Sequence, residues 1–205
     1  MMYVHTRNKY YIHDGIDVTV LNFSAENNYV IDKIKVISLN TYEKQTSHYD
    51  ILILHAPNIR NHYRFLKKYA QNFSNLVFFF HGHEVLRINE VYPQSYPYIH
   101  RSIVKNFVQD YYDLIKLALW RRYFPQIIYK SHFVFVSQWM YREFVKYIKL
   151  PETIFKNHFS IIYNSVDKIF EEQTFDNLCD KKYDFITIRA NLDGSKYAID
   201  IVNRI

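Results

Sequence analysis

The chain has 205 residues, 49% of them apolar, which excludes a disordered protein and allows one well-buried core or one and a half domains. Its net charge of +6 favours an anionic partner without choosing among a membrane surface, a nucleic acid and a phosphorylated substrate. A single cysteine excludes an intramolecular disulfide and a cysteine-based metal cluster. No apolar run reaches the roughly 18 residues that span a bilayer, and no signal peptide is recognisable, so we expect a cytoplasmic protein.

Short runs with strand character recur along the chain. Several are apolar at both odd and even positions, which is typical of strands covered on both faces in a parallel sheet. We expect strands at 17–23, 32–39, 50–56, 76–82, 133–137, 158–166 and 184–189.

Segments of helical period separate these strands. One covers 59–73 and a longer one runs from 99 to about 123. The residues of the longer segment expected to face the core are Ile103, Phe107, Tyr111, Leu114 and Ala118. Ser137 is expected to cap a further helix, which ends before Pro151. The alternation of strands and helices predicts an α/β fold with a doubly wound, mainly parallel, Rossmann-like sheet.

One domain boundary is expected from the composition. Residues 1–166 would form the first domain, 167–183 a polar linker, and 184–205 the beginning of a second domain. A single strand and helix cannot bury both of their faces, so we expect the second domain to be incomplete. Residues 7–21 look like the end of a helix leading into the second strand of a sheet, so we expect the first strand to be missing as well.

The stretch His81-Gly82-His83-Glu84 follows directly on an apolar strand. Ligands of open α/β sheets bind beyond the carboxyl ends of the strands, where a histidine can donate a proton or a hydrogen bond to an anionic or carbohydrate group. The alternative is a simple turn, with Glu84 capping the next helix and His83 at the surface.

A metal site at this stretch would need more ligands than the stretch supplies. Imidazole and carboxylate suit zinc or iron, but His81, His83 and Glu84 would have to recruit a distant histidine such as His55 or His62. We therefore expect no metal. The chain also lacks the glycine motifs of nucleotide triphosphatases, dinucleotide enzymes and α/β-hydrolases.

Four motifs occur in order along nearly the whole chain: FFFHGHE (78–84), SHFVFVSQWM (131–140), SIIYNSVD (160–167) and FITIRANLDGSKYAIDIV (185–202). Together they resemble the GT-B glycosyltransferases of the family-4 type, which are retaining enzymes that use nucleotide sugars. The resemblance implies the acceptor-side half of a GT-B pair, followed by the first strand and helix of the donor domain. It implies no cofactor, with a nucleotide sugar as the donor substrate and a carbohydrate or lipid-linked acceptor.

The resemblance also implies roles for individual residues. His81 would be catalytic, close to the donor sugar and the leaving diphosphate. The residues that would bind donor or substrate are Gly82, Glu84, Ser137, Asn164, Arg189 and Lys196. The sequence departs from the family pattern at Ser165, where the family has glycine. The family's pair of glutamates in the second domain would lie beyond Ile205, so we expect no turnover from these 205 residues alone.

The segment 117–130 mixes aromatic and basic residues, as segments at a bilayer interface do. The candidates for membrane contact are Trp120, Arg121, Arg122, Tyr123, Phe124 and Lys130. The alternative is a helix end with ordinary packing. No pattern in the chain supports a nucleic-acid partner.

These observations predict a glycosyltransferase that acts in surface-polysaccharide or glycolipid assembly, in the cytoplasm or on the inner face of the membrane. The alternative is a non-catalytic α/β module that binds a lipid, a membrane surface or a protein partner. The sugar, the acceptor and the linkage are not specified by the sequence.

Overall fold

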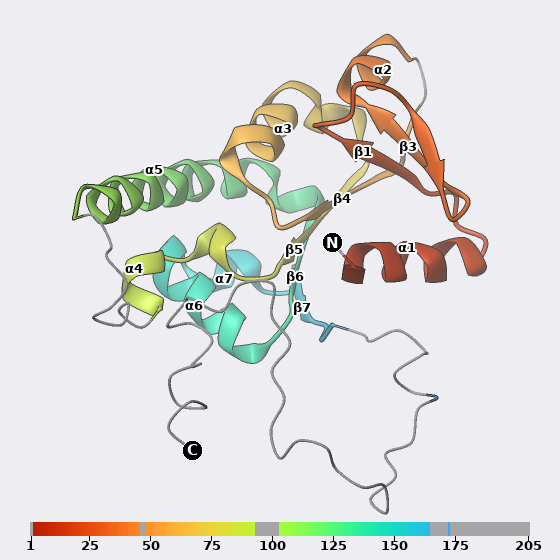
Figure 1. The fold of residues 1–205 in the computed structure, drawn as a ribbon. Coiled ribbons are helices and arrows are strands. Elements are labelled where there is room, and N and C mark those ends of the chain that lie inside the picture. Colours follow the sequence, from red (N-terminus) through yellow and green to blue (C-terminus); the bar gives the residue numbers. More distant parts are fainter. Residues whose placement is uncertain (1, 46–47, 93–102, 165–171, 173–205) are drawn as a thin grey trace, which may run out of the picture.

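The computed structural model describes residues 2–45, 48–92, 103–164 and 172 (Figure 1). Its central element is a four-stranded sheet in which each strand is parallel to its neighbours. The strands follow one another across the sheet in chain order: β4 (Ile51–His55), β5 (Asn75–Phe80), β6 (Ser131–Phe135) and β7 (Phe159–Ile161). The predicted α/β class with a parallel, Rossmann-like sheet is therefore confirmed.

Helices lie on both sides of this sheet (Figure 1). One side carries the connections between successive strands, and the other carries α1 (Met2–His13). The connecting elements are η1 (Ile59–Tyr63), α3 (Arg64–Tyr69), η2 (Ala70–Asn72), η3 (His83–Val85), α4 (Ile88–Val91), α5 (Ile103–Ile127), η4 (Ile128–Lys130), α6 (Gln138–Ile148) and α7 (Glu152–Phe155).

A second, smaller sheet lies beside β4 (Figure 1). It has the order β1-β3-β2, with β1 parallel and β2 antiparallel to β3. Its elements are β1 (Thr19–Asn22), β2 (Tyr29–Ile31), β3 (Ile34–Ser38) and the following α2 (Leu39–Lys44). The helix that was expected before the first of these strands is α1.

The core lies between the four-stranded sheet and the connecting helices, and aromatic rings dominate it. Alternate residues of β5 and β6, such as Phe78 and Phe133, stack with ring centroids 5.2 Å apart. Trp120 and Phe124 of α5 pack on this layer, and both are fully buried. Because alternate strand residues point to opposite faces, Phe79 points away from this core, toward α1.

Most of the predicted strands are confirmed, and most of these are shorter than expected, whereas the strand expected at 133–137 keeps its length but begins at Ser131. The structure adds β2, whose three residues are exposed and so leave no buried apolar pattern in the sequence. Asp32 and Lys33 join β2 to β3 with positive φ angles of 47° and 67°, as in a tight hairpin turn. The predicted strand 184–189 lies outside the described residues, as do the linker 167–183 and the second domain.

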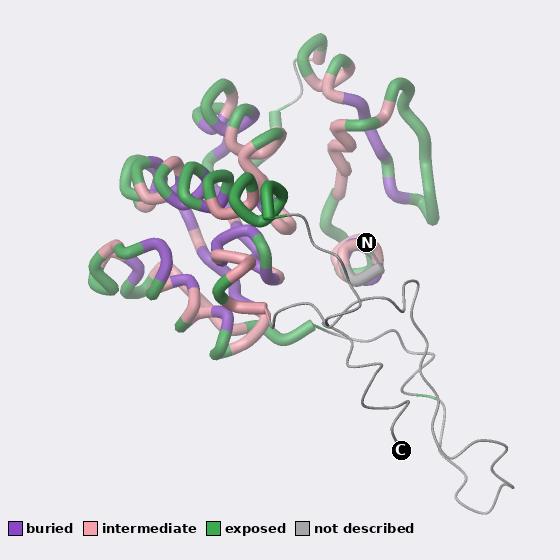
Figure 2. The backbone as a smooth tube through the Cα atoms, turned by 60° about the vertical axis from the view of Figure 1, so that its left-hand side comes forward, coloured by how far each residue is buried: buried purple, intermediate pink, exposed green. Residues whose placement is uncertain are grey.

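The prediction for the long helix was right about its existence and wrong about its orientation. Residues such as Ile103, Phe107 and Leu114, expected in the core, are exposed (Figure 2). The buried residues of α5 are Asp113, Lys116, Leu117, Trp120, Tyr123, Phe124 and Ile127. Because α5 carries apolar residues on two opposite faces, its periodicity could not show which face turns inward.

Candidate functional site

The carboxyl ends of the four parallel strands meet at one edge of the sheet. The register pairs His55 with Phe79 and Phe80 with Phe135. Hydrogen bonds continue past the strands, because the amide of Val136 donates to Phe80 and that of Ile162 donates to Phe135. The residues that follow the strands therefore gather at this edge, and they include His81, Ser137 and Asn164, which were predicted to contact the donor or substrate.

Two imidazoles face each other at this edge. His55 is the last residue of β4, and His81 directly follows β5. Nδ1 of His55 lies 3.4 Å from Nε2 of His81, so one ring can donate a hydrogen bond to the other. The ring centroids are 5.7 Å apart, with 29° between the planes. The His55 ring also stacks on the Phe79 ring, with the two ring centroids 4.7 Å apart, and this contact fixes the orientation of the imidazole.

Both imidazoles are held in the uncharged form at neutral pH. Burial, with further contributions from His81 and Arg7, lowers the pKa of His55 to about 3. Burial and the Arg7 guanidinium lower the pKa of His81 to about 4. Arg7 belongs to α1, and its Cζ lies 4.4 Å from the centroid of the Phe79 ring. The positive charge beside the pair is thus a fixed guanidinium, and the histidines offer neutral hydrogen-bonding groups.

A third histidine, His62 of η1, adds to the same neutral cluster. Burial lowers the pKa of His62 to about 4. Its Nδ1 accepts a hydrogen bond from the amide of Asn58 at 3.1 Å, which leaves the proton on Nε2. His62 also contributes to the lowered pKa of His55, so the two rings lie within electrostatic reach of each other.

The loop after β5 is shaped by Glu84. Its Oε2 accepts a hydrogen bond from the amide of Gly82 at 2.6 Å, and the carboxylate is buried. Burial raises the pKa of Glu84, although backbone amides of the loop counteract this. The carboxylate therefore bonds its own turn instead of capping the next helix. A direct contact of Glu84 with a ligand stays a prediction.

Gly82 is buried in this turn. A Cβ atom at this position would have the Tyr92 hydroxyl as its nearest neighbour, at 3.9 Å, which is an ordinary contact. His83 is exposed, as the turn alternative expected, and its ring lies 5.0 Å from that of Tyr92. Approach of a ligand to Gly82 stays a prediction.

A buried ion pair in α5 holds this loop from the core side. Nζ of Lys116 lies 2.6 Å from Oδ1 of Asp113 and donates to the carbonyls of His83 and Leu86, each at 2.8 Å. Oδ2 of Asp113 accepts from the amide of Ile88 at 2.8 Å. The two side chains are 4% and 0% exposed, so the loop that follows His81 is tied to α5 by desolvated, charge-assisted bonds.

The other predicted site residues are placed as follows. Ser137 is the N-cap of α6, as predicted, and its Oγ accepts from the amide of Met140 at 3.1 Å. Asn164 is exposed, just past β7. Arg189 and Lys196 lie outside the described residues. The binding roles of all four stay predictions.

The hypothesis of bilayer contact by the segment 117–130 is wrong for its aromatic residues. Trp120, Tyr123 and Phe124 are buried in the core and cannot reach a membrane surface. Two of the basic residues are also occupied. Arg121 donates to the carbonyls of Tyr147 and Ile148 at the end of α6, and Lys130 donates to those of Ala70 and Phe73. Arg122 is exposed. These contacts agree with the alternative, a helix end with ordinary packing.

The sequence carries little signal for the residues that complete the site. His55 could have been predicted as part of the site from the sequence. It ends β4, His81 directly follows β5, and adjacent parallel strands end at the same edge of a sheet. Arg7 and the pair Asp113–Lys116 carry no such signal, since only the packing of α1 and α5 brings them there. Among the described residues, no three of histidine, cysteine, aspartate and glutamate lie close enough together to hold a metal ion.

Comparison with protein-family models, with curated proteins and with solved structures found no match to this chain.

Proposed function

We propose that this chain forms the acceptor-side half of a glycosyltransferase of the GT-B, family-4 type, which transfers a sugar from a nucleotide sugar to a carbohydrate or lipid-linked acceptor. The observation that carries the proposal is the neutral His81, placed at the carboxyl end of a parallel strand beside His55. This edge is where open α/β sheets bind ligands. The order of the four motifs supports the same function.

The chemistry of the site suits a sugar hydroxyl. A neutral imidazole can donate one hydrogen bond and accept another, as a hydroxyl does, without adding charge to the site. During transfer, the acceptor oxygen bonds to the anomeric carbon while the bond from that carbon to the diphosphate oxygen breaks, and the acceptor proton leaves with the diphosphate. His81 would hold the donor sugar while the acceptor oxygen enters on the face from which the diphosphate leaves, with Arg7 nearby as a fixed positive charge.

The proposal is tested by following the histidine ring signals in NMR spectra during titration with UDP-sugars, GDP-sugars and short saccharides. We expect the signals of His55 and His81 to shift, and His81→Gln to abolish the shift at His55. His132→Gln is the control, because His132 is a partly buried strand histidine bonded to Ser160 at 2.8 Å. His132→Gln should leave the shifts of the His55 and His81 ring signals unchanged.

A turnover assay for released nucleoside diphosphate, run on the chain extended by a complete donor domain, completes the test. Where turnover is detected, His81→Ala should lower kcat by at least about tenfold with little effect on donor binding, because the bond strengthens as charge develops. Unmoved ring signals with every donor and saccharide would contradict the proposal and favour the non-catalytic binding module.

A further inference from the structure

The N-terminal half of α5 presents apolar side chains to solvent, opposite the face that packs into the core (Figure 2). We call this set the outward face of α5. Its members, each at least half exposed, are Ile103, Val104, Phe107, Val108, Tyr111 and Leu114. The face continues at lower exposure through Tyr112 and Ile115. None of these side chains contributes to the core described above.

The size of the outward face sets it apart from ordinary surface residues. Phe107 and Tyr111 are 73% and 62% exposed, and rings of this kind carry roughly 150–250 Å² each. With the aliphatic side chains between them, the apolar area exceeds the few hundred Å² that soluble monomers usually expose. Patches of this size mark contact with a protein or a membrane.

The charges around the outward face distinguish between these partners. The two acidic residues of α5 turn away from it: Asp110 accepts a hydrogen bond from Asn89, and Asp113 is buried against Lys116. Arg122, about two turns beyond the apolar residues, is exposed and basic. An apolar face with basic residues and no acid on it matches a surface that is itself apolar and anionic.

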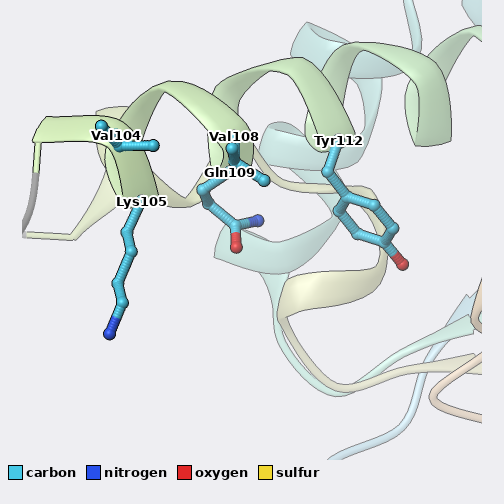
Figure 3. A pocket seen from close by; sticks show the side chains of 5 residues that line it. All are labelled: Val104, Lys105, Val108, Gln109 and Tyr112. Carbon is cyan, nitrogen blue, oxygen red and sulfur yellow. The ribbon is translucent and has the colours of Figure 1, made fainter.

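Lys105 lies on the flank of the outward face (Figure 3). It lines a shallow pocket on α5 together with Val104, Val108, Gln109 and Tyr112, and its ammonium extends away from the helix axis. A lysine beside apolar residues can keep its charge at the headgroup level of a bilayer while its methylene chain contacts lipid. The Tyr112 ring on the same flank has an apolar body and a polar tip, which also suits the headgroup region.

We propose that the outward face of α5 docks on a bilayer that contains anionic lipid, with the helix lying in the plane of the interface. Ile103, Phe107 and Tyr111 would enter the acyl boundary, and Lys105 and Arg122 would meet the headgroups. Within the described part of the chain, no helix has the length and apolarity needed to cross a membrane, which agrees with a helix that lies on one. The proposal does not depend on the glycosyltransferase activity.

Vesicle flotation tests the proposal with the chain as it is. The vesicles are phosphatidylcholine alone and an equimolar mixture of phosphatidylcholine and phosphatidylglycerol, each at low and high salt. We expect stronger binding to the anionic vesicles and weaker binding at high salt, because salt screens the basic residues. The double variant Val104→Gln/Phe107→Gln should lower the partition coefficient by at least about tenfold, since both apolar side chains would leave water on docking.

The control changes equally exposed apolar residues elsewhere. Val30 on β2 and Tyr163 after β7 are each 69% exposed, against 70% for Val104 and 73% for Phe107. The double variant Val30→Gln/Tyr163→Gln should bind as the unchanged chain does. Absence of binding to anionic vesicles, or equal binding by the two double variants, would overturn the proposal. So would a dimer, detected by light scattering, that only Val104→Gln/Phe107→Gln dissociates, because it would assign the outward face to self-association.

Discussion

The two facing histidines show how much a side chain depends on its surroundings. An unperturbed imidazole has a pKa of about 6.5, yet burial and the nearby Arg7 lower the pKa of His55 to about 3 and that of His81 to about 4. Both are therefore neutral at pH 7 in the folded chain. In the unfolded chain, they would take up protons at a higher pH than in the folded one.

This difference predicts a pH dependence of stability. Between about pH 6.5 and pH 4 the unfolded chain binds protons that the folded chain does not, so the free energy of unfolding should fall as the pH is lowered through this window. Urea unfolding at pH 7 and pH 5 measures the slope. His55→Gln should make it shallower, whereas the control His13→Gln should leave it unchanged, because the side chain of His13 is 85% exposed. Identical slopes for His55→Gln and the unchanged chain would contradict the prediction.

At the scale of elements, α5 is unusual because it is apolar on two opposite faces. Its C-terminal half contributes Trp120 and Phe124 to the core, where the two rings stack with centroids 5.0 Å apart. Its N-terminal half turns polar residues inward, and Asn89 of α4 donates to the Asn106 carbonyl and the Asp110 carboxylate, each at 3.0 Å. The helix is thus held by aromatic packing at one end and by hydrogen bonds at the other.

Two phenylalanines on α5 test this orientation. Phe124 is fully buried, so Phe124→Ala should lower the free energy of unfolding by about 3–5 kcal/mol, the usual cost of removing a core ring. Phe107 is 73% exposed, and Phe107→Ala should change the free energy of unfolding by less than about 0.5 kcal/mol. Urea unfolding of both variants under one set of conditions measures the difference. A larger loss of unfolding free energy for Phe107→Ala than for Phe124→Ala would contradict the observed orientation of α5 and favour the one that periodicity predicted.

At the scale of the whole molecule, the ion pair Asp113–Lys116 joins the core to the candidate site. Lys116 bonds two carbonyls of the loop after His81, while Asp113 bonds the amide of Ile88. Both side chains are buried, and removing one partner would leave the other charge without compensation. The position of the loop therefore depends on an ion pair that belongs to α5 and not to the strand end that carries His81.

Loss of this lysine should be costly. We expect Lys116→Met to lower the free energy of unfolding by about 3–5 kcal/mol, because it leaves Asp113 buried without its cation. The double variant Lys116→Met/Asp113→Asn should recover part of the loss, since the amide carries no charge. Lys146→Met is the matched control, because Lys146 pairs with Glu143 at the same helical spacing but its side chain is 60% exposed. The measurement is chemical unfolding of the three variants. Equal losses of unfolding free energy for Lys116→Met and Lys146→Met would contradict the prediction.

The sequence by itself determined the fold class and one edge of the site. Strands such as β5 and β6 are apolar at both odd and even positions, which predicts a parallel sheet with covered faces. A histidine directly after a strand must then lie at the carboxyl edge, and Ser137 before a helical period predicts a cap. These are local properties, and the structure agrees with them at His81 and Ser137.

Only the tertiary structure decided which groups meet at that edge and which face of α5 is buried. Arg7 reaches Phe79 because α1 packs on the second face of the sheet, and Lys116 reaches the loop carbonyls because α5 crosses beneath them. Periodicity reports the spacing of apolar residues along one helix, and in α5 two faces satisfy that spacing. Trp120 and Phe124 decide which face is buried. Both rings pack edge-on against the aromatic layer of the sheet, so the face that carries them turns inward.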